Sequence, residues 1–139
     1  MLTERRIAKL SIFSALALVM ASGVIAFASV SVSAQQSGGS KVSIVEGAST
    51  MADKAFDPSP ANVKVGDTVT WTNNDGQTHT VTSGKGSSDP NMGKDFDSSP
   101  GLKTLLAPKQ TFDHKFTAAG EFDYFCQVHP TMVGKVVVS

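Results

Sequence analysis

Cysteine is almost absent from this chain, since Cys126 is the only one among 139 residues. A single cysteine cannot form an intramolecular disulfide, so the stability of the fold must come from a packed core. It also argues against a structural zinc site, which needs four strong nitrogen or sulfur ligands and usually several cysteines. In an exported protein an unpaired cysteine is either a liability or a functional residue, and metal ligation would hold it as a thiolate.

An excess of charge of either sign is absent as well. The chain has 12 basic and 12 acidic residues. Leaving out residues 1–34 removes three basic residues and one acidic residue, so nine and eleven remain, a net charge of about −2. Without a basic stripe, nucleic-acid binding is excluded. A chain of this length forms one ordinary domain.

Helical periodicity is missing from residues 41–139, where turn signals instead recur about every ten residues. In residues 67–73, Val69 and Trp71 share one face and three threonines share the other. The pattern predicts an all-β fold, a Greek-key antiparallel β-sandwich of seven to eight strands. The expected strands are residues 41–46, 62–65, 67–73, 77–83, 102–106, 109–116, 121–126 and 134–139.

Turn residues and prolines indicate how these strands are connected. The sequence Asn74-Asp75-Gly76 predicts a hairpin between the strands on either side of it. Two prolines exclude a central strand at residues 56–60. Residues 84–101 are rich in Gly, Ser, Asp and Pro and predict a long loop, which Phe96 is expected to anchor to the body of the domain.

The first 34 residues have the pattern of an export signal. Three basic residues stand near the start: Arg5, Arg6 and Lys9. Residues 10–30 carry no charge, and the small residues that follow suit cleavage after Ala34. The uncharged run approaches the roughly 20 residues that span a bilayer, so the segment is either a cleaved signal peptide or a retained N-terminal anchor helix.

This leader divides the chain into three parts. Residues 1–34 are the signal peptide or membrane anchor, residues 35–40 a flexible Gly/Ser linker, and residues 41–139 the domain. With the basic residues kept inside, both alternatives place the domain outside the cytoplasm, in the periplasm or at the outer face of the membrane. Residues 10–30 could then tether it to that membrane.

The chemically informative residues gather near the end of the chain. Cys126, His129 and Met132 stand at i, i+3 and i+6, which spaces a thiolate, an imidazole and a thioether along one loop. A trigonal His₂Cys site with a weak axial Met is the arrangement that holds copper for electron transfer. Such a site needs a second histidine, which His79 can supply from a distant part of the chain. Calcium and magnesium prefer oxygen ligands, which this loop does not offer.

Three segments resemble the cupredoxin family of blue copper proteins, in particular its plastocyanin, amicyanin and pseudoazurin members. They are residues 69–73 (VTWTN), 79–81 (HTV) and 120–136 (GEFDYFCQVHPTMVGKV), in the order in which the family has them. The resemblance implies one copper ion that cycles between Cu(II) and Cu(I). Its ligands would be His79, Cys126 and His129, with Met132 in the axial position.

The resemblance also implies how redox protein partners would meet the site. His129 would be the electron port, at a partly exposed edge, inside an apolar docking patch. The expected members of that patch are Pro130, Met132, Val133, Leu106 and Pro108. Many relatives carry Asn after the first histidine, where its side chain ties the two ligand loops together; here that position is Thr80, whose hydroxyl could take this role.

Several other residues are expected to be structural. His114 alternates with Phe112 and Phe116, which predicts packing at a strand edge rather than metal ligation. Trp71 and Tyr124 are expected in the core. The acidic residues of the second half are expected to be solvated: Asp89, Asp95, Asp97 and Asp123.

The leading hypothesis is therefore a type 1 blue-copper protein, a monomeric domain that shuttles one electron between exported or membrane redox partners. The alternative is copper storage or delivery, a role that favours exposed Met- and His-rich motifs. After the leader the chain has only three methionines, Met51, Met92 and Met132. A copper enzyme would need further histidines beyond the three in the chain, so catalysis is not expected. An adhesion sandwich without metal would leave the ligand spacing without a role.

Overall fold

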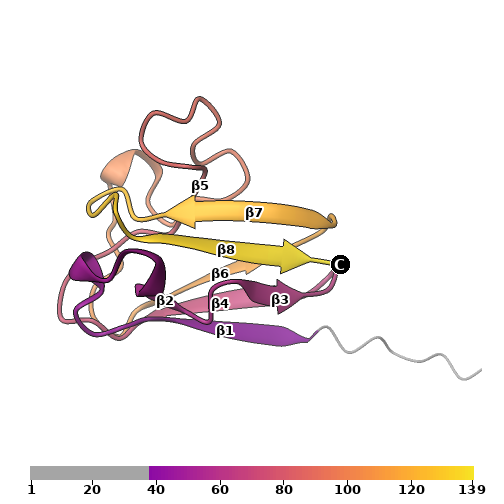
Figure 1. Ribbon diagram of the computed structural model, residues 1–139, viewed down its shortest axis with the longest axis horizontal. Helices are drawn as coiled ribbons and strands as arrows, with labels where there is room; N and C mark the ends of the chain where they lie inside the picture. Colours follow the sequence, from indigo (N-terminus) through magenta and orange to yellow (C-terminus); the bar gives the residue numbers. More distant parts are fainter. Residues whose placement is uncertain (1–37) are drawn as a thin grey trace, which may run out of the picture. The chain divides into compact units, whose positions relative to one another are not determined.

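The computed structural model describes residues 38–139, so the predicted leader and most of the predicted linker lie outside the described residues. Within them, eight strands form two four-stranded sheets (Figure 1). The strands are β1 (Gly39–Ile44), β2 (Phe56–Asp57), β3 (Ala61–Val63), β4 (Thr68–Asn73), β5 (Thr82–Ser83), β6 (Thr111–Lys115), β7 (Gly120–Phe125) and β8 (Val133–Val138). Three short 3₁₀ helices connect some of them: η1 (Ala48–Thr50), η2 (Ala52–Lys54) and η3 (Pro100–Leu102).

The two sheets enclose one hydrophobic core, which confirms the predicted β-sandwich. The strand order is β2-β1-β4-β6 in the first sheet and β3-β8-β7-β5 in the second. Figure 1 shows β7 and β8 lying side by side, and they pair in antiparallel register over their whole length. Among the described strands, β1 with β4 and β3 with β8 are parallel pairs, a detail that the sequence pattern does not carry.

The alternation expected in residues 67–73 is confirmed in β4. Val69 and Trp71 are fully buried, while the threonines between them are half-exposed. The Trp71 ring packs edge-on against Tyr124 of the opposite sheet, with 5.5 Å between ring centroids. Strand periodicity thus places both predicted core aromatics where the two sheets meet.

The predicted hairpin across residues 74–76 is wrong. Strand β4 pairs with β1 and β6, whereas β5 pairs with β7 in the other sheet. The chain between them crosses from one sheet to the other, and on the way His79 and Leu106 exchange two backbone hydrogen bonds, 3.1 and 2.9 Å long. Residues 79–83 are all buried, so this segment is not the half-exposed strand that the alternation predicted.

The predicted strand at residues 102–106 is also wrong. Helix η3 includes its first residue, Leu102, and only Leu106 pairs, through its bridge to His79. The long excursion between β5 and β6 forms the loops at the top of Figure 1. Phe96 anchors it as expected, since its side chain is 4% exposed and stacks on Trp71 with 5.5 Å between ring centroids.

The edges of the first sheet differ slightly from the expected boundaries. Strand β1 begins at Gly39, so the last two residues of the predicted linker pair with β4. Strand β2 lies at the sheet edge and ends before the two prolines, consistent with their lack of ladder donors.

No helix within residues 38–139 is long and apolar enough to cross a membrane.

Candidate metal centre

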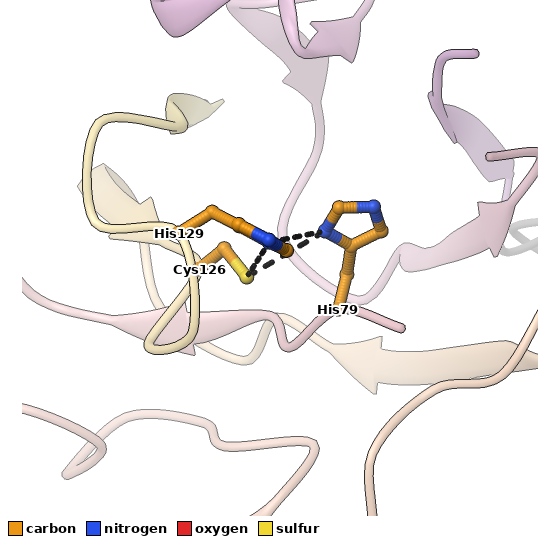
Figure 2. Close-up of side chains that lie close together, drawn as sticks. All are labelled: His79, Cys126 and His129. Carbon is orange, nitrogen blue, oxygen red and sulfur yellow. Dashed lines mark hydrogen bonds between the residues drawn. The ribbon is translucent and has the colours of Figure 1, made fainter. Parts of the chain in front are cut away.

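Three of the predicted ligands come together although 47 residues separate His79 from Cys126 (Figure 2). Cys126 follows β7 directly, and His129 lies in the loop that joins β7 to β8. His79 lies in the crossing segment between β4 and β5, where its backbone bridge to Leu106 fixes its position. Both sheets therefore contribute to the placement of the site.

The donor atoms of these three side chains point toward one another. His79 Nδ1 lies 3.2 Å from His129 Nδ1, and Cys126 Sγ lies 3.7 Å from the first and 3.9 Å from the second. Bonds from nitrogen and sulfur to an ion such as zinc are about 2.0–2.3 Å long, so donors in tetrahedral to trigonal positions around one ion lie roughly 3.3–3.9 Å apart. The observed separations fit a single ion held by two imidazoles and a thiolate, a donor set suited to copper.

Cys126 is fully buried, and its surroundings favour the thiolate. Burial raises the pKa of the thiol, but hydrogen bonds from His79 and from nearby backbone N–H groups outweigh burial and lower the pKa to about 6. One of these groups, the Thr80 N–H, donates to Sγ over 3.3 Å. The thiolate is the form that ligates metals, so the metal-free protein already holds it near neutral pH.

His79 is fully buried and is held from its far side by a carboxylate. Its Nε2 lies 2.8 Å from Oδ2 of Asp75, which is itself 5% exposed. Burial lowers the pKa of His79, but Cys126 and Asp75 raise it more, so the net shift is upward. The imidazole thus has a partner at each nitrogen, one in the site and one behind it.

Met132 lies at the end of the ligand loop and is fully buried. Its backbone N–H donates to the carbonyl of His129 over 2.9 Å, and its carbonyl accepts from the Cys126 N–H over 3.1 Å. These two bonds fold residues 126–132 into a tight loop that holds His129 beside Cys126.

Thr80 ties the two ligand segments together, which was the open question about the residue after the first histidine. Its Oγ1 accepts a hydrogen bond from the backbone N–H of Gln127 over 2.8 Å. Because Thr80 follows His79 and Gln127 follows Cys126, this bond links neighbours of two ligands directly. The hydroxyl therefore does take the role expected of it.

A second polar network lies near the ligand loop, and the sequence pattern did not predict it. The Gln127 side chain donates to Thr82 over 2.8 Å and to Asp97 over 3.3 Å, and the Thr82 hydroxyl donates to Asp97 over 3.0 Å. Asp97 is half-buried, so it is not the solvated residue that was expected. No local pattern distinguishes Asp97 from its acidic neighbours, and Asp75 likewise resembled an ordinary turn residue.

Only some members of the predicted docking patch are exposed. His129 is half-buried, and Pro108, Pro130 and Val133 are exposed, the last to 39%. Met132 and Leu106 belong to the core instead, at 0% and 8% exposure.

The third histidine does not join this group. His114 lies on β6 and packs against Phe96 and Phe116, with 4.9 and 4.8 Å between ring centroids. Burial lowers its pKa. The expectation of a packing role for His114 is confirmed.

A two-sheet β-sandwich that presents two histidines and a cysteine from these loops defines a cupredoxin. The chain belongs to the plastocyanin/azurin family of copper-binding proteins, whose family model matches residues 41–139. The resemblance seen in the sequence is thereby confirmed, and the expected cofactor, one copper ion, is the one that the family binds.

Individual relatives agree with this assignment. Chloroplastic plastocyanin of Tetradesmus obliquus is 39% identical over 85 residues, which are 60% of this chain and 57% of that protein. Amicyanin-alpha of Methylorubrum extorquens is 38% identical over 88 residues, 63% of this chain and 67% of that protein. The match thus covers less than two thirds of the length of the plastocyanin.

Solved structures show the same fold. A novel purple cupredoxin from Nitrosopumilus maritimus has a TM-score of 0.61 and 31% identity, covering 72% of this chain and 99% of that one. The reduced Cu(I) form of an amicyanin mutant has a TM-score of 0.54 and 32% identity, covering 73% of this chain and 83% of that one.

Proposed function

We propose that the protein is a one-electron carrier with a type 1 copper site, which His79, Cys126 and His129 would hold with Met132 as a fourth, weaker ligand. The observation that carries this proposal is the convergence of two imidazole Nδ1 atoms and a buried Cys126 Sγ within 3.2–3.9 Å of one another. When bound there, copper would supply reversible cycling between Cu(II) and Cu(I).

The protein's own contribution is to hold the ligands still. Cu(II) and Cu(I) prefer different geometries, so a donor set that does not rearrange lowers the cost of each electron transfer. The Thr80–Gln127 bond, the His79–Leu106 bridge and the backbone bonds of the ligand loop each restrain one part of the set. Burial of Cys126 and His79 keeps water from the thiolate side of the site.

Electrons would enter and leave through His129, the half-buried member of the set. Pro108, Pro130 and Val133 are exposed, and their side chains would supply an apolar surface on which redox protein partners dock briefly.

The decisive experiment is a Cu(II) titration of residues 35–139 followed by visible absorption and voltammetry. We expect an intense thiolate-to-copper charge-transfer band at one equivalent and a reversible one-electron wave. The protein should be blue, although a purple colour, like that of the purple cupredoxin from Nitrosopumilus maritimus, would equally support a copper–thiolate bond. Cys126→Ser should abolish the band, whereas His114→Gln, which changes a histidine outside the site, should leave it intact.

Two results would contradict the proposal. A colourless copper complex, or a band unchanged in Cys126→Ser, would remove Cys126 from the ligand set. A coloured complex without a reversible wave would favour the alternative, copper storage or delivery.

We also propose that the domain acts outside the cytoplasm, in the periplasm or tethered at the outer face of the membrane. The support is the basic start, uncharged run and small-residue ending of residues 1–34. N-terminal sequencing of the protein expressed from the full chain checks this. A start at Gln35 means a cleaved signal peptide, an intact leader in the membrane fraction means an anchor, and an intact leader in the cytosol refutes the proposal.

A further inference from the structure

Behind His79, on the side away from the other two ligands, lies the carboxylate of Asp75. Its exposure is 5%, and both of its oxygens are occupied. Oδ1 accepts from the backbone N–H groups of Gly47 and Gly76 over 3.1 and 2.7 Å, and Oδ2 lies 2.8 Å from His79 Nε2. A buried carboxylate with this many fixed contacts has one orientation, and that orientation faces the imidazole.

Three further hydrogen bonds, all made by Asn73, hold the turn that carries Asp75. Its backbone N–H donates to Asn73 Oδ1 over 2.9 Å. The Asn73 side-chain amide in turn donates to the carbonyls of Gln77 and Leu106 over 2.7 and 2.9 Å. Because Leu106 also bridges the backbone of His79, the carboxylate and the imidazole share one rigid frame.

The structure assigns Asp75 as a positioning residue of the copper site, a role that rests on the function proposed above. With copper bound, the carboxylate would accept the Nε2–H of His79, which leaves the Nδ1 lone pair to ligate the ion beside Cys126 and His129. A carboxylate behind a metal-ligating histidine fixes the tautomer and ring orientation and makes the imidazole a stronger ligand.

Its charge has a second consequence for the redox couple. A negative group beside the site stabilises Cu(II) more than Cu(I), because the oxidised ion carries the larger positive charge. Asp75 therefore lowers the reduction potential of the site. The other histidine ligand has no such carboxylate among residues 38–139, so the effect enters through His79 alone.

The test compares Asp75→Asn with Asp97→Asn by voltammetry of the copper-loaded protein. Asn has nearly the shape of Asp without its charge, and Asp97 bonds to Gln127 and Thr82 but to no ligand side chain. We expect Asp75→Asn to weaken Cu(II) relative to Cu(I) by about tenfold, the lower end of the loss in metal affinity that follows removal of such a partner. For a one-electron couple, each tenfold raises the potential by about 59 mV. Asp97→Asn should move it much less.

A second measurement does not need a variant that folds. In isotope-labelled wild-type protein loaded with Cu(I), which is diamagnetic, nuclear magnetic resonance should show a slowly exchanging proton on Nε2 of His79. Rapid exchange of that proton with water would overturn the assignment.

The outcomes separate this inference from the function on which it rests. If wild-type protein gives the charge-transfer band but Asp75→Asn has an unchanged potential, or one shifted no more than in Asp97→Asn, the role of Asp75 is refuted while the carrier stands. If wild-type protein gives no band at all, both are refuted together.

Discussion

The two histidines of the site both direct Nδ1 toward Cys126, but their surroundings are opposite. His79 is fully buried, and it has a carboxylate behind Nε2 and a two-way backbone bridge to Leu106. His129 is half-buried on a seven-residue loop, residues 126–132, and within residues 38–139 its imidazole makes hydrogen bonds only to Cys126 and His79. One ligand is thus part of the core, and the other belongs to the surface.

The buried side of the site, at His79, and its exposed side, at His129, therefore differ in role. The buried side fixes the ligand geometry and the charge that the metal experiences. In the electron carrier proposed above, the exposed side would give partners a short path to the copper through His129, which is half-buried. An electron carrier needs both properties, and the asymmetry lets it have both without weakening either.

Removing each histidine should give the largest effect and the clearest contrast. We expect both His79→Gly and His129→Gly to lose the charge-transfer band at one equivalent of Cu(II). Added imidazole should restore it in His129→Gly, because the vacated space opens to solvent. Added imidazole should not restore the band in His79→Gly, because the space left by the buried His79 side chain is enclosed. Visible absorption with increasing imidazole checks this, and near-ultraviolet circular dichroism confirms that each variant is folded.

His114→Gly serves as the control, since it also removes a histidine but lies away from the site. Its band should match that of the wild-type protein. Restoration by imidazole to the same extent in both ligand variants would mean that the burial of His79 does not distinguish the two sides.

The same contrast should appear in the titration of the metal-free thiol. The pKa of Cys126 falls from its ordinary value of 9.0 to about 6, against the effect of burial, and the His79 side chain lowers it most, whereas His129 acts through its backbone N–H. We therefore expect thiolate ultraviolet absorbance to appear with a midpoint near pH 6. His79→Gln should raise that midpoint by at least one pH unit, or about 1.4 kcal/mol, and His129→Gln should move it little.

The signs for folding stability follow from these shifts. Cys126 has a lowered pKa, so its stabilising contribution to the metal-free fold is present above pH 9.0 and is lost as the pH falls through about 6. His79 has a raised pKa, so its contribution is present below pH 6.5 and is lost as the pH rises through its folded value. Equal midpoints of the thiolate titration in His79→Gln and His129→Gln would contradict the difference between the two histidines.

The part of the candidate site that lies on the loop could be predicted from the sequence because its signal is local. Cys126, His129 and Met132 lie on one short loop, and a thiolate, an imidazole and a thioether at that spacing are typical of a copper site. Strand β4 was predicted for the same reason, since Val69 and Trp71 alternate with polar residues within a few positions. Both predictions depend on short-range patterns that survive folding unchanged.

The environment of the ligands could not be predicted, because it depends on contacts between distant segments. Asp75 resembled an ordinary turn residue. A hairpin was predicted around it, whereas the chain crosses there from one sheet to the other. Only the packed structure shows that this crossing brings His79 against Leu106, 27 positions later in the numbering, and sets a carboxylate behind it. Composition and periodicity contain no information about which buried side chain faces which.

The smallest effect that we predict concerns the Thr80–Gln127 hydrogen bond, which links the buried segment of His79 to the exposed loop of His129. Thr80→Val keeps the shape of the side chain but removes the oxygen that accepts the Gln127 N–H, leaving a partly buried donor without its partner. We expect a loss of about 1–2 kcal/mol in the free energy of unfolding of the metal-free protein, measured by denaturant titration. Thr80→Ser, which keeps the hydroxyl, should lose clearly less, and Thr70→Val on the half-exposed face of β4 should stay within about 0.5 kcal/mol of the wild-type protein. If Val and Ser at position 80 cost the same, the hydroxyl does not join the buried ligand segment to the exposed one, and the rigidity of the site must come from the Leu106 bridge and the loop's own backbone bonds.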